Sequence, residues 1–341
     1  MSYHKRVIVD FDDTLAFTTN RDWMGAKPNK PLIAKLNKLH NEGWQIDIFT
    51  ARGSLSCKTR KEAEEKYLDS MLMWLLKHNV KYDIVSFNKP LGAYYIDDKA
   101  ITPEDFVNVN IEQLEGGLSG SDIFTDGKLV HKQDDNAHDV KTWFGQVGSA
   151  HVPVVDRIVG NTLTMEYVPH DKEYFANNPY VALGLVQEKL EMFKTIYDYP
   201  TATFDDYVQR ICAHAIGSDY VAELDKLVLS KLLYQIPLTA GFGHGDFGVT
   251  NLLFNNDKLK MIDPITETFT CTELDVAKFI ASLYINKYSS DLIDLAYNTL
   301  SVFNNIPTHV LDLFISTELT RIVKYHPDKE FVMEQIRNVV K

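Results

Sequence analysis

The sequence predicts an α/β protein of two domains: an N-terminal domain with a mostly parallel sheet over residues 1–108, and an α+β domain over residues 112–341. In the first third of the chain, short apolar segments with strand character alternate with segments of helical periodicity. This alternation is typical of a parallel sheet covered by helices. After Phe106 the pattern changes to a Gly-rich segment with strand-like runs, and the chain is helix-rich from Tyr180 onward.

The N-terminal domain begins with RVIVDFDDTL, from Arg6 to Leu15. The β-branched run in this segment is expected to be a strand buried on both faces. Asp10, Asp12 and Asp13 follow it in quick succession. Carboxylates so close together repel one another unless a cation lies among them, so the turn predicts a metal site. A solvated acidic turn that caps the next helix is the alternative explanation.

The next elements place further polar residues at strand ends. A helix is expected through Leu32 and Leu39 up to Gly43, a second helix at 59–79, and strands at 44–49, 82–87 and 93–96. The residues that follow the four strands are Asp10, Thr50, Lys89 and Asp97. Ligands of parallel sheets bind beyond the carboxyl ends of the strands, so these side chains are expected to converge on one edge.

The four residue types form a set suited to phosphoryl transfer. A carboxylate can attack phosphorus to give an aspartyl-phosphate, while a hydroxyl and an ammonium hold the phosphoryl oxygens. Acidic side chains complete a Mg²⁺ site that offsets repulsion between nucleophile and substrate. The segments VDFDDTL, IFTAR, FNKP and YIDDKA resemble, in this order, motifs of the haloacid dehalogenase-like (HAD) phosphatases, which have a Rossmann-like fold.

The resemblance implies a role for each matched residue. Asp10 would be the nucleophile and Asp12 the general acid and base. Thr50 and Lys89 would bind phosphate. Asp10, Asp12 and Asp97 would hold Mg²⁺, Asp12 through its backbone carbonyl.

The spacing of these residues leaves no room for a cap domain. Asp10 and Thr50 are 40 residues apart, and Thr50 and Lys89 are 39 apart, so one helix and its connections use up each interval. The site is therefore expected to be open. Uncapped sequences with FTARG and YYIDDKA resemble phosphatases from surface-polysaccharide gene sets.

The second domain opens with a Gly-rich segment that leads to a lysine. Gly116, Gly117 and Gly120 would let backbone amides approach phosphates closely, although a linker between domains explains them as well. Lys132 ends the strand-like run KLVHK, where a kinase places its phosphate-binding lysine; an exposed strand lysine is the alternative.

The segment GHGDFGVTNLLFNNDKLKMID, at 243–263, carries the chemistry of this domain. His244, Asp246 and Asn251 have the spacing of a kinase catalytic loop, and a predicted hairpin leads to Asp263. Asp246 would accept the proton of a substrate hydroxyl, while Asn251 and Asp263 would hold Mg²⁺ on the phosphates of ATP.

This segment resembles the aminoglycoside phosphotransferase and choline kinase-like family, from about residue 112 to the end of the chain. The resemblance implies a protein-kinase-like fold with a small β-rich lobe and a larger helical lobe. ELDVAKFIASLY, at 273–284, fits the helix that follows the metal-binding aspartate. Such kinases pair the strand lysine with a glutamate on the next helix, but no Glu lies between Lys132 and Gly148. Asp139 would have to substitute for it, or the phosphate clamp is incomplete.

Composition limits the classes of partner. The 341 residues carry a net charge of −12 without a long basic run, which argues against nucleic acid or an anionic membrane as the main partner. The three cysteines are far apart, as expected of reduced thiols. The N-terminal segment lacks an uninterrupted apolar stretch, so a cytoplasmic protein is expected.

The sequence therefore predicts a cytoplasmic, bifunctional enzyme that uses Mg²⁺ and ATP. Its phosphatase half would act on a small phosphorylated metabolite and its kinase half on a hydroxylated acceptor of sugar or polyol type, in surface-polysaccharide synthesis. Two alternatives stay open. A polynucleotide kinase-phosphatase joins the same activities but calls for basic patches. A phosphatase with a degenerate, kinase-like binding domain would also explain the missing glutamate.

Overall fold

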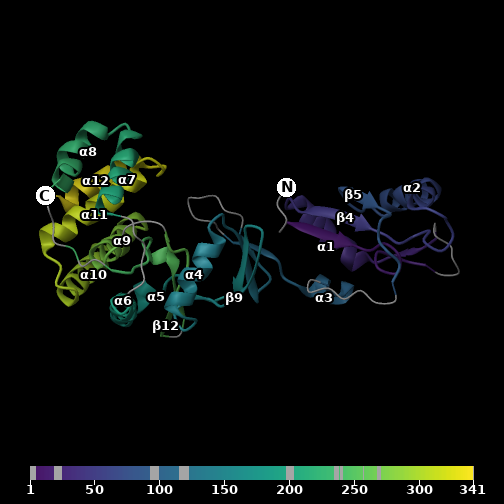
Figure 1. Ribbon diagram of the computed structural model, residues 1–341, viewed down its shortest axis with the longest axis horizontal. Helices are drawn as coiled ribbons and strands as arrows, with labels where there is room; N and C mark the ends of the chain where they lie inside the picture. Colours follow the sequence, from purple (N-terminus) through teal and green to yellow (C-terminus); the bar gives the residue numbers. More distant parts are fainter. Residues whose placement is uncertain are drawn as a thin grey trace. The chain divides into compact units, whose positions relative to one another are not determined.

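A computed structural model describes residues 5–18, 25–92, 100–114, 123–196, 203–233, 238, 241–255, 257–266 and 270–340. The chain divides into two compact units (Figure 1). Unit 1 comprises Met1–Gln113 with Phe124–Gly127, and unit 2 comprises Leu114–Ile123 with Lys128–Lys341.

Unit 1 contains a parallel sheet with helices. Strands β1 (Arg6–Val9), β4 (Gln45–Phe49) and β5 (Ile84–Ser86) pair in the order β1-β4-β5, and both pairings are parallel. The other elements of the unit are α1 (Lys30–Asn41), α2 (Arg60–Lys77), α3 (Pro103–Asn108) and the short antiparallel pair β2 (Ala16–Phe17) and β3 (Lys27–Pro28). The predicted parallel strands and the two longer helices are thus present in the described part of the unit.

Local signals in the sequence set the ends of these helices. The side chain of Asn29 accepts a hydrogen bond from the Leu32 N–H at the start of α1, and Thr59 accepts one from Glu62 N–H at the start of α2. Gly43 follows α1 in a left-handed conformation with φ of +84°. Apolar residues at helical spacing on α1 and α2 are buried together with residues of β4 in the core of unit 1.

The first strand is not buried on both faces, contrary to the prediction from its β-branched run. Val9 is buried, but Ile8 is 62% exposed. Successive side chains of a strand point to opposite faces, and the described residues cover only the face of β1 that carries Val9. The strand predicted at 93–96 and Asp97 lie outside the described residues.

Unit 2 begins with antiparallel strands. β8 (Leu129–Gln133) and β9 (Val155–Val159) flank β10 (Thr162–Glu166) in antiparallel pairings. β6 (Glu112–Leu114) and β7 (Ile123–Thr125) complete the sheet in the order β6-β7-β8-β10-β9, and the boundary between the two units falls within each of these two strands. Helix α4 (Ala137–Val147) follows β8. The predicted hairpin is confirmed as β11 (Leu252–Asn255) paired with β12 (Lys258–Met261).

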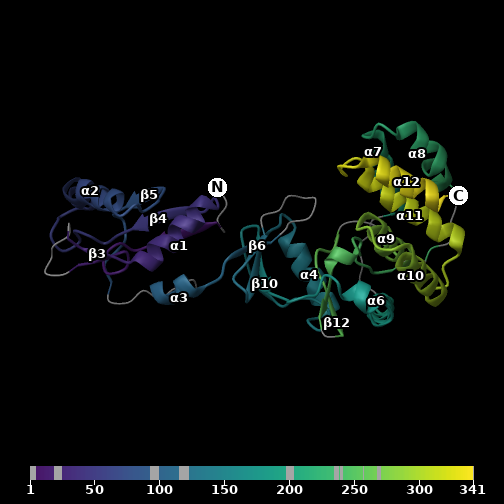
Figure 2. The same cartoon turned by 180° about the vertical axis from the view of Figure 1, so that it is seen from behind.

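The rest of unit 2 is helical (Figure 2). The helices are α5 (Tyr174–Asn177), α6 (Pro179–Phe193), α7 (Phe204–Ile216), α8 (Val221–Leu227), α9 (Thr272–Ile285), α10 (Ser290–Phe303), α11 (Thr308–Val323) and α12 (Lys329–Val339), with short 3₁₀ turns η1 (Leu229–Leu233) and η2 (Val249–Asn251). Helix α9 is buried on every side, and α11 packs against α7, α9 and α12. Among the described residues, none of the helices has the length and apolar character needed to cross a membrane.

Replacing Trp74 should destabilise unit 1. Its ring is 1% exposed, packs edge-on against Phe11, and donates a hydrogen bond to the Ala26 carbonyl over 3.0 Å. Trp74→Ala is expected to lower the free energy of unfolding by roughly 3–5 kcal/mol, because it removes a large buried side chain and strands a buried carbonyl. Urea unfolding followed by circular dichroism measures this. The neighbouring Met73→Ala, at a side chain that is 60% exposed, is the control, and equal losses from both variants would contradict the packing argument.

Candidate functional site

Unit 1 brings four of the predicted residues together at the carboxyl ends of its strands. The ammonium of Lys89 lies 2.5 Å from a carboxylate oxygen of Asp10, and the Thr50 hydroxyl donates to Asp12 over 3.2 Å. Asp10 and Thr50 each directly follow a strand, β1 and β4, and Lys89 follows β5 by three residues. We call these residues, with Arg52, the strand-end cluster.

Arg52 is a member of the cluster that the sequence analysis missed. Its guanidinium binds Asp12 through two nitrogens, with Nη2 at 2.5 Å and Nε at 3.2 Å from the same oxygen, and it lies over the Phe11 ring. The side chain is only 4% exposed. Its place two residues after Thr50, at the end of β4, was the available signal.

The strand-end cluster is balanced in charge, since two carboxylates face two cations. A phosphoryl group would compete for the two cations, and a divalent cation would take up the freed carboxylates. Asp97 lies outside the described residues, and within the described ranges no three His, Cys, Asp or Glu side chains group closely enough to hold a metal. Gly116, Gly117 and Gly120 of unit 2 also lie outside those ranges.

In unit 2, two glycines allow the loop at 243–246 to lie tightly against α9. A Cβ on Gly243 would lie 2.5 Å from a carboxylate oxygen of Asp275, and Gly245 has φ of +75°. His244 between them is fully buried. Burial lowers the pKa of His244 to about 4, so its neutral ring accepts the Asp246 N–H through Nδ1 over 3.3 Å. His244 therefore stabilises the conformation of the loop.

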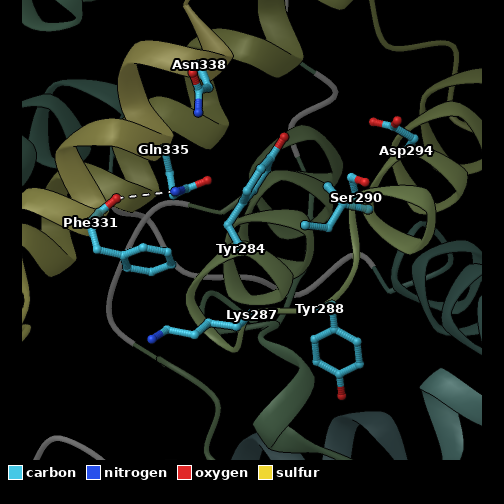
Figure 3. A pocket seen from close by; sticks show the side chains of 9 residues that line it. Tyr284, Lys287, Tyr288, Ser290, Asp294, Phe331, Gln335 and Asn338 are labelled. Atoms are coloured by element: carbon cyan, nitrogen blue, oxygen red, sulfur yellow. Dashed lines mark hydrogen bonds between the residues drawn. The ribbon is translucent and has the colours of Figure 1, made fainter.

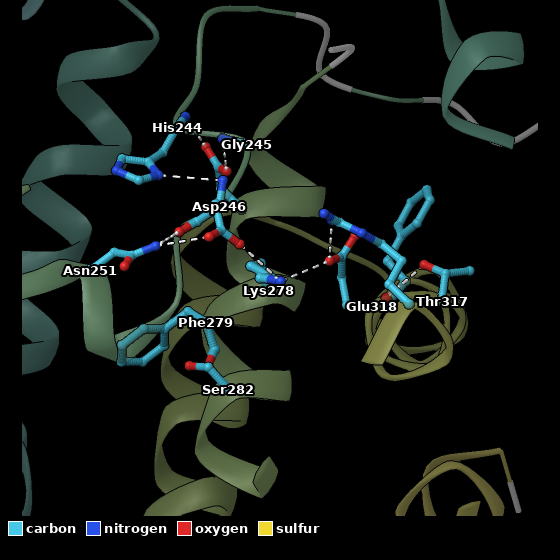
Figure 4. A network of polar contacts seen from close by, with 12 residues as sticks. His244, Gly245, Asp246, Asn251, Lys278, Phe279, Ser282, Thr317 and Glu318 are labelled. Carbon is cyan, nitrogen blue, oxygen red and sulfur yellow. Dashed lines mark hydrogen bonds and ion pairs between the residues drawn. The ribbon is translucent and has the colours of Figure 1, made fainter. Parts of the chain in front are cut away.

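Asp246 and Asn251 form a direct contact at the centre of this site (Figure 4). The Asn251 amide donates to the backbone carbonyl and to the carboxylate of Asp246, both over 2.9 Å. The other carboxylate oxygen lies 2.9 Å from the ammonium of Lys278, on α9. Burial raises the pKa of Asp246, but the positive charges of Lys278 and Arg321 outweigh this effect and hold the pKa below its ordinary value.

One face of α9 holds the loop in place. The carboxylate of Asp275 accepts the backbone N–H of His244 over 2.8 Å and of Gly245 over 2.9 Å, and the hydroxyl of Ser282 accepts the N–H of Val249 over 2.8 Å. Asp275, Lys278 and Ser282 recur at helical spacing, so they share this face. The sequence predicts this helix but not the contacts of these three residues, for which polar side chains in an otherwise apolar helix were the available signal.

The hairpin β11–β12 returns the chain to Asn251 and so positions Asp263. The Ile262 N–H donates to the Asn251 carbonyl over 3.0 Å. Asp263 has a left-handed backbone with φ of 59°, a conformation uncommon for a residue other than glycine. Its carboxylate lies 2.8 Å from the ammonium of Lys132, which reaches it from β8.

Lys132 has a second acidic partner, Asp134, and not Asp139, which the sequence offered as a candidate. Asp134, on the same strand–loop segment, lies 3.0 Å from the Lys132 ammonium, whereas Asp139 is exposed in the first turn of α4. Burial lowers the pKa of Lys132, but Asp263 and Asp134 together raise it above its ordinary value, so the side chain is charged. Two carboxylates therefore hold Lys132 without a glutamate on α4.

Behind Asp246 lies a set of buried charges from α9 and α11, which the sequence analysis also missed. Glu318 is 2% exposed and lies 3.4 Å from Lys278 and 2.7 Å from Arg321. The hydroxyl of Tyr207, on α7, donates to Glu318 over 2.8 Å. We call Asp246, Lys278, Glu318, Arg321 and Tyr207 the buried charge network.

A hollow of about 480 Å³ lies elsewhere in unit 2, beyond the C-terminal end of α9 (Figure 3). Its lining includes Tyr284, Lys287, Tyr288 and Phe331. No lining residue belongs to the buried charge network or to the loop at 243–246, so the hollow is separate from Asp246.

Asp275 should make the stability of unit 2 depend on pH. Burial raises the pKa of Asp275 from its ordinary value of 3.8 to about 7, although the N–H groups of His244 and Gly245 oppose this shift. Between these values the folded protein holds a proton that the unfolded chain has released, so the free energy of unfolding should fall as the pH rises through this window. Asp275→Asn, which cannot ionise, should remove this part of the pH dependence.

Urea unfolding at several pH values checks this, with Asp225→Asn as the control, since Asp225 is exposed on α8. Parallel pH profiles for the wild type and Asp275→Asn would contradict the assignment.

No protein-family model and no curated protein matches the sequence. Among solved structures, a protein from Vibrio cholerae is 33% identical over 31% of this chain and 89% of its own, with a TM-score of 0.29. A choline/ethanolamine kinase family protein from Mesorhizobium loti is 10% identical over 67% of this chain and 86% of its own, with a TM-score of 0.49. A thermostable mutant of the aminoglycoside phosphotransferase APH(4)-Ia, in ternary complex with AMP-PNP and hygromycin B, is 14% identical over 68% of this chain and 93% of its own, with a TM-score of 0.49. Each of the last two structures aligns with about two thirds of this chain.

Proposed function

We propose that unit 2 is an ATP-dependent phosphotransferase for small hydroxylated metabolites. The observation that carries this proposal is the contact between Asn251 and Asp246, with the Lys132–Asp263 ion pair beside it. Phosphoryl transfer from ATP needs a carboxylate that can take a hydroxyl proton, an amide and a second carboxylate that hold a metal, and a lysine that binds the phosphates. All four side chains come from elements packed within one unit.

The donor set fits Mg²⁺ with ATP. The amide nitrogen of Asn251 is used on Asp246, and among the described residues no side chain or backbone group donates to its amide oxygen. That oxygen and the carboxylate of Asp263 are hard ligands of the kind Mg²⁺ takes together with substrate phosphates. When bound, the metal would offset negative charge on the phosphates, and Lys132 would bind the same phosphates through its ammonium group.

Asp246 would act as the base in the transfer. As the acceptor oxygen bonds to the terminal phosphorus of ATP, the bond from that phosphorus to the ADP oxygen breaks, and the hydroxyl proton passes to the Asp246 carboxylate. Because Lys278 and Arg321 keep Asp246 ionised at neutral pH, the carboxylate is ready to accept that proton. Asn251 fixes its orientation.

Asp246→Asn should abolish ATP-dependent transfer, since an amide cannot take the proton. The loss expected is on the order of 10²–10⁴-fold in kcat. Release of ADP in the presence of hydroxylated metabolites measures it, and ATP binding in a thermal-shift assay should persist. Asp225→Asn serves as the matched control on the exposed surface of α8. Undiminished turnover by Asp246→Asn would remove Asp246 from the reaction.

For unit 1 we propose a Mg²⁺-dependent phosphomonoesterase that works through an aspartyl-phosphate. The pairing of Asp10 with Lys89 and of Asp12 with Thr50 and Arg52 favours it, together with the resemblance of the four motifs to HAD phosphatases. The Asp10 oxygen would attack phosphorus as the substrate alcohol leaves with a proton from Asp12. Water, deprotonated by Asp12, would then release phosphate from Asp10.

Asp10→Asn should abolish phosphate release and leave ATP-dependent transfer unchanged. A loss on the order of 10³-fold or more is expected when a covalent nucleophile is removed. A phosphomonoester hydrolysis assay measures it. Asp13→Asn is the matched control, because Asp13 is exposed in the same turn and its left-handed backbone, with φ of 56°, suits asparagine. Equal activity in the two variants would exclude Asp10 as the nucleophile.

We further propose sugar- or polyol-type substrates, in line with the resemblance of FTARG to phosphatases of surface-polysaccharide gene sets. A net charge of −12 favours small metabolites over polynucleotides. A salt-dependent affinity for DNA or RNA ends, measured on the intact chain, would favour the polynucleotide kinase-phosphatase instead.

A further inference from the structure

An arginine that has no side-chain partner among the described residues lies next to the buried charge network. Arg210 is on α7, three residues after Tyr207, whose hydroxyl is bonded to Glu318. Residues three apart share a helix face, so Arg210 extends from the face of α7 that meets α11. It is half-buried, and its charge interacts with Arg321, Glu318 and Asp246.

The neighbouring charges are already paired with one another, whereas Arg210 is unpaired in the part of the chain that the structure describes. Lys278 contacts both Asp246 and Glu318, and Arg321 contacts Glu318. Within the described ranges, the guanidinium of Arg210 makes no hydrogen bond or ion pair. Among the described residues, no side-chain nitrogen of Arg210 is both buried and unpaired, so its donors reach solvent and are available to a ligand that arrives from outside.

The balance of charge around Asp246 gives the sign of that partner. Lys278, Arg321 and Arg210 carry three positive charges, against two carboxylates, Asp246 and Glu318. Asp275 directs its carboxylate to the N–H groups of His244 and Gly245, and its pKa of about 7 keeps much of it neutral. Burial and the like charge of Arg321 lower the pKa of Arg210, and the nearby carboxylates do not fully offset this lowering. A cationic acceptor would worsen this imbalance, whereas an anionic one would relieve it.

We propose that the acceptor of unit 2 carries an anionic oxygen group, a phosphate or a carboxylate, which Arg210 binds while Asp246 takes the proton of its hydroxyl. This inference rests on the proposed kinase function and names the class of its substrate. The planar guanidinium offers paired donors to either group, which lysine cannot do. Arg210 is thus a specificity-determining residue. The bond formed runs from the acceptor hydroxyl to the terminal phosphorus of ATP, ADP leaves, and the anionic group is unchanged.

The test is acceptor-dependent ADP release by the full chain with Mg²⁺ and ATP. The probes share one carbon skeleton and differ in charge: glucose, glucose 1-phosphate, glucuronate and glucosamine, with hygromycin B as a larger polycation. Higher kcat/KM for glucose 1-phosphate or glucuronate than for the neutral and cationic probes is expected, and the two anionic arms tell which group is preferred. A preference for glucose, glucosamine or hygromycin B would overturn the inference.

Two variants separate recognition from folding. Arg210→Gln is expected to raise the KM for the anionic probe by roughly 10- to 100-fold, as when a hydrogen bond to a charged group is lost, with the KM for ATP unchanged. Arg210→Lys should restore part of the affinity, because it returns the charge without the paired donors. Lys226→Gln, which removes a positive charge from the exposed surface of α8, should leave both KM values unchanged. An unchanged acceptor KM in Arg210→Gln would overturn the inference.

The failure of the kinase proposal would look different. If no probe stimulates ADP release, and Asp246→Asn gives the same background as the wild type, the kinase function itself is overturned. If Asp246-dependent transfer occurs but is indifferent to acceptor charge and to Arg210, the kinase stands and only the anionic acceptor is overturned.

Discussion

The hydrogen bonds from the backbone of His244 and Gly245 to the Asp275 carboxylate are the constraint on which the rest of the unit 2 site depends. They fix the loop at 243–246 against a helix that is itself buried on every side. The helix then places Lys278 beside Asp246 and Ser282 beside Val249, one and two turns further on. A rotation of α9 by even part of a turn would disturb all three contacts together, so the position of Asp246 depends on the packing of the core of the unit.

Both units hold their carboxylates in the same physical way, by pairing each with a cation or with N–H groups. Asp10 has Lys89 and Asp12 has Arg52, while Asp246 has Lys278. Pairing reduces the cost of keeping these groups charged and partly buried in the absence of substrate. It also means that the phosphate and the divalent cation of the proposed reactions would have to take the place of these partners.

The sequence could predict those site residues that lie close together along the chain or that follow the ends of parallel strands. Asn251 is five residues from Asp246, and a short hairpin leads to Asp263, so spacing alone indicated their proximity. Asp10, Thr50 and Lys89 were predictable because parallel strands bring their carboxyl ends to one edge.

The residues that the sequence analysis missed meet across helices far apart in the chain. Lys278 pairs with Glu318 of α11, and Tyr207 of α7 bonds to the same carboxylate. A charged residue in an apolar helix indicates that a buried partner exists, but only the packing of the helices shows which one. Likewise, the pairing of Lys132 with Asp134 depends on how the chain turns after β8, and the exposure of Ile8 depends on what covers its face of β1.

An anionic acceptor also bears on why the two proposed activities, which oppose each other, would share one chain. A kinase and a phosphatase that act on the same hydroxyl would only hydrolyse ATP. If the acceptor of unit 2 already carries a phosphate, however, the transfer produces a metabolite with two phosphates, and a phosphomonoesterase can remove the original one. The net result is a phosphate moved from one position of a common skeleton to another, driven by the hydrolysis of one ATP. This outcome requires that unit 1 discriminate between the two positions. Since its motifs leave no interval for a cap domain, the groups around the strand-end cluster would have to provide that discrimination.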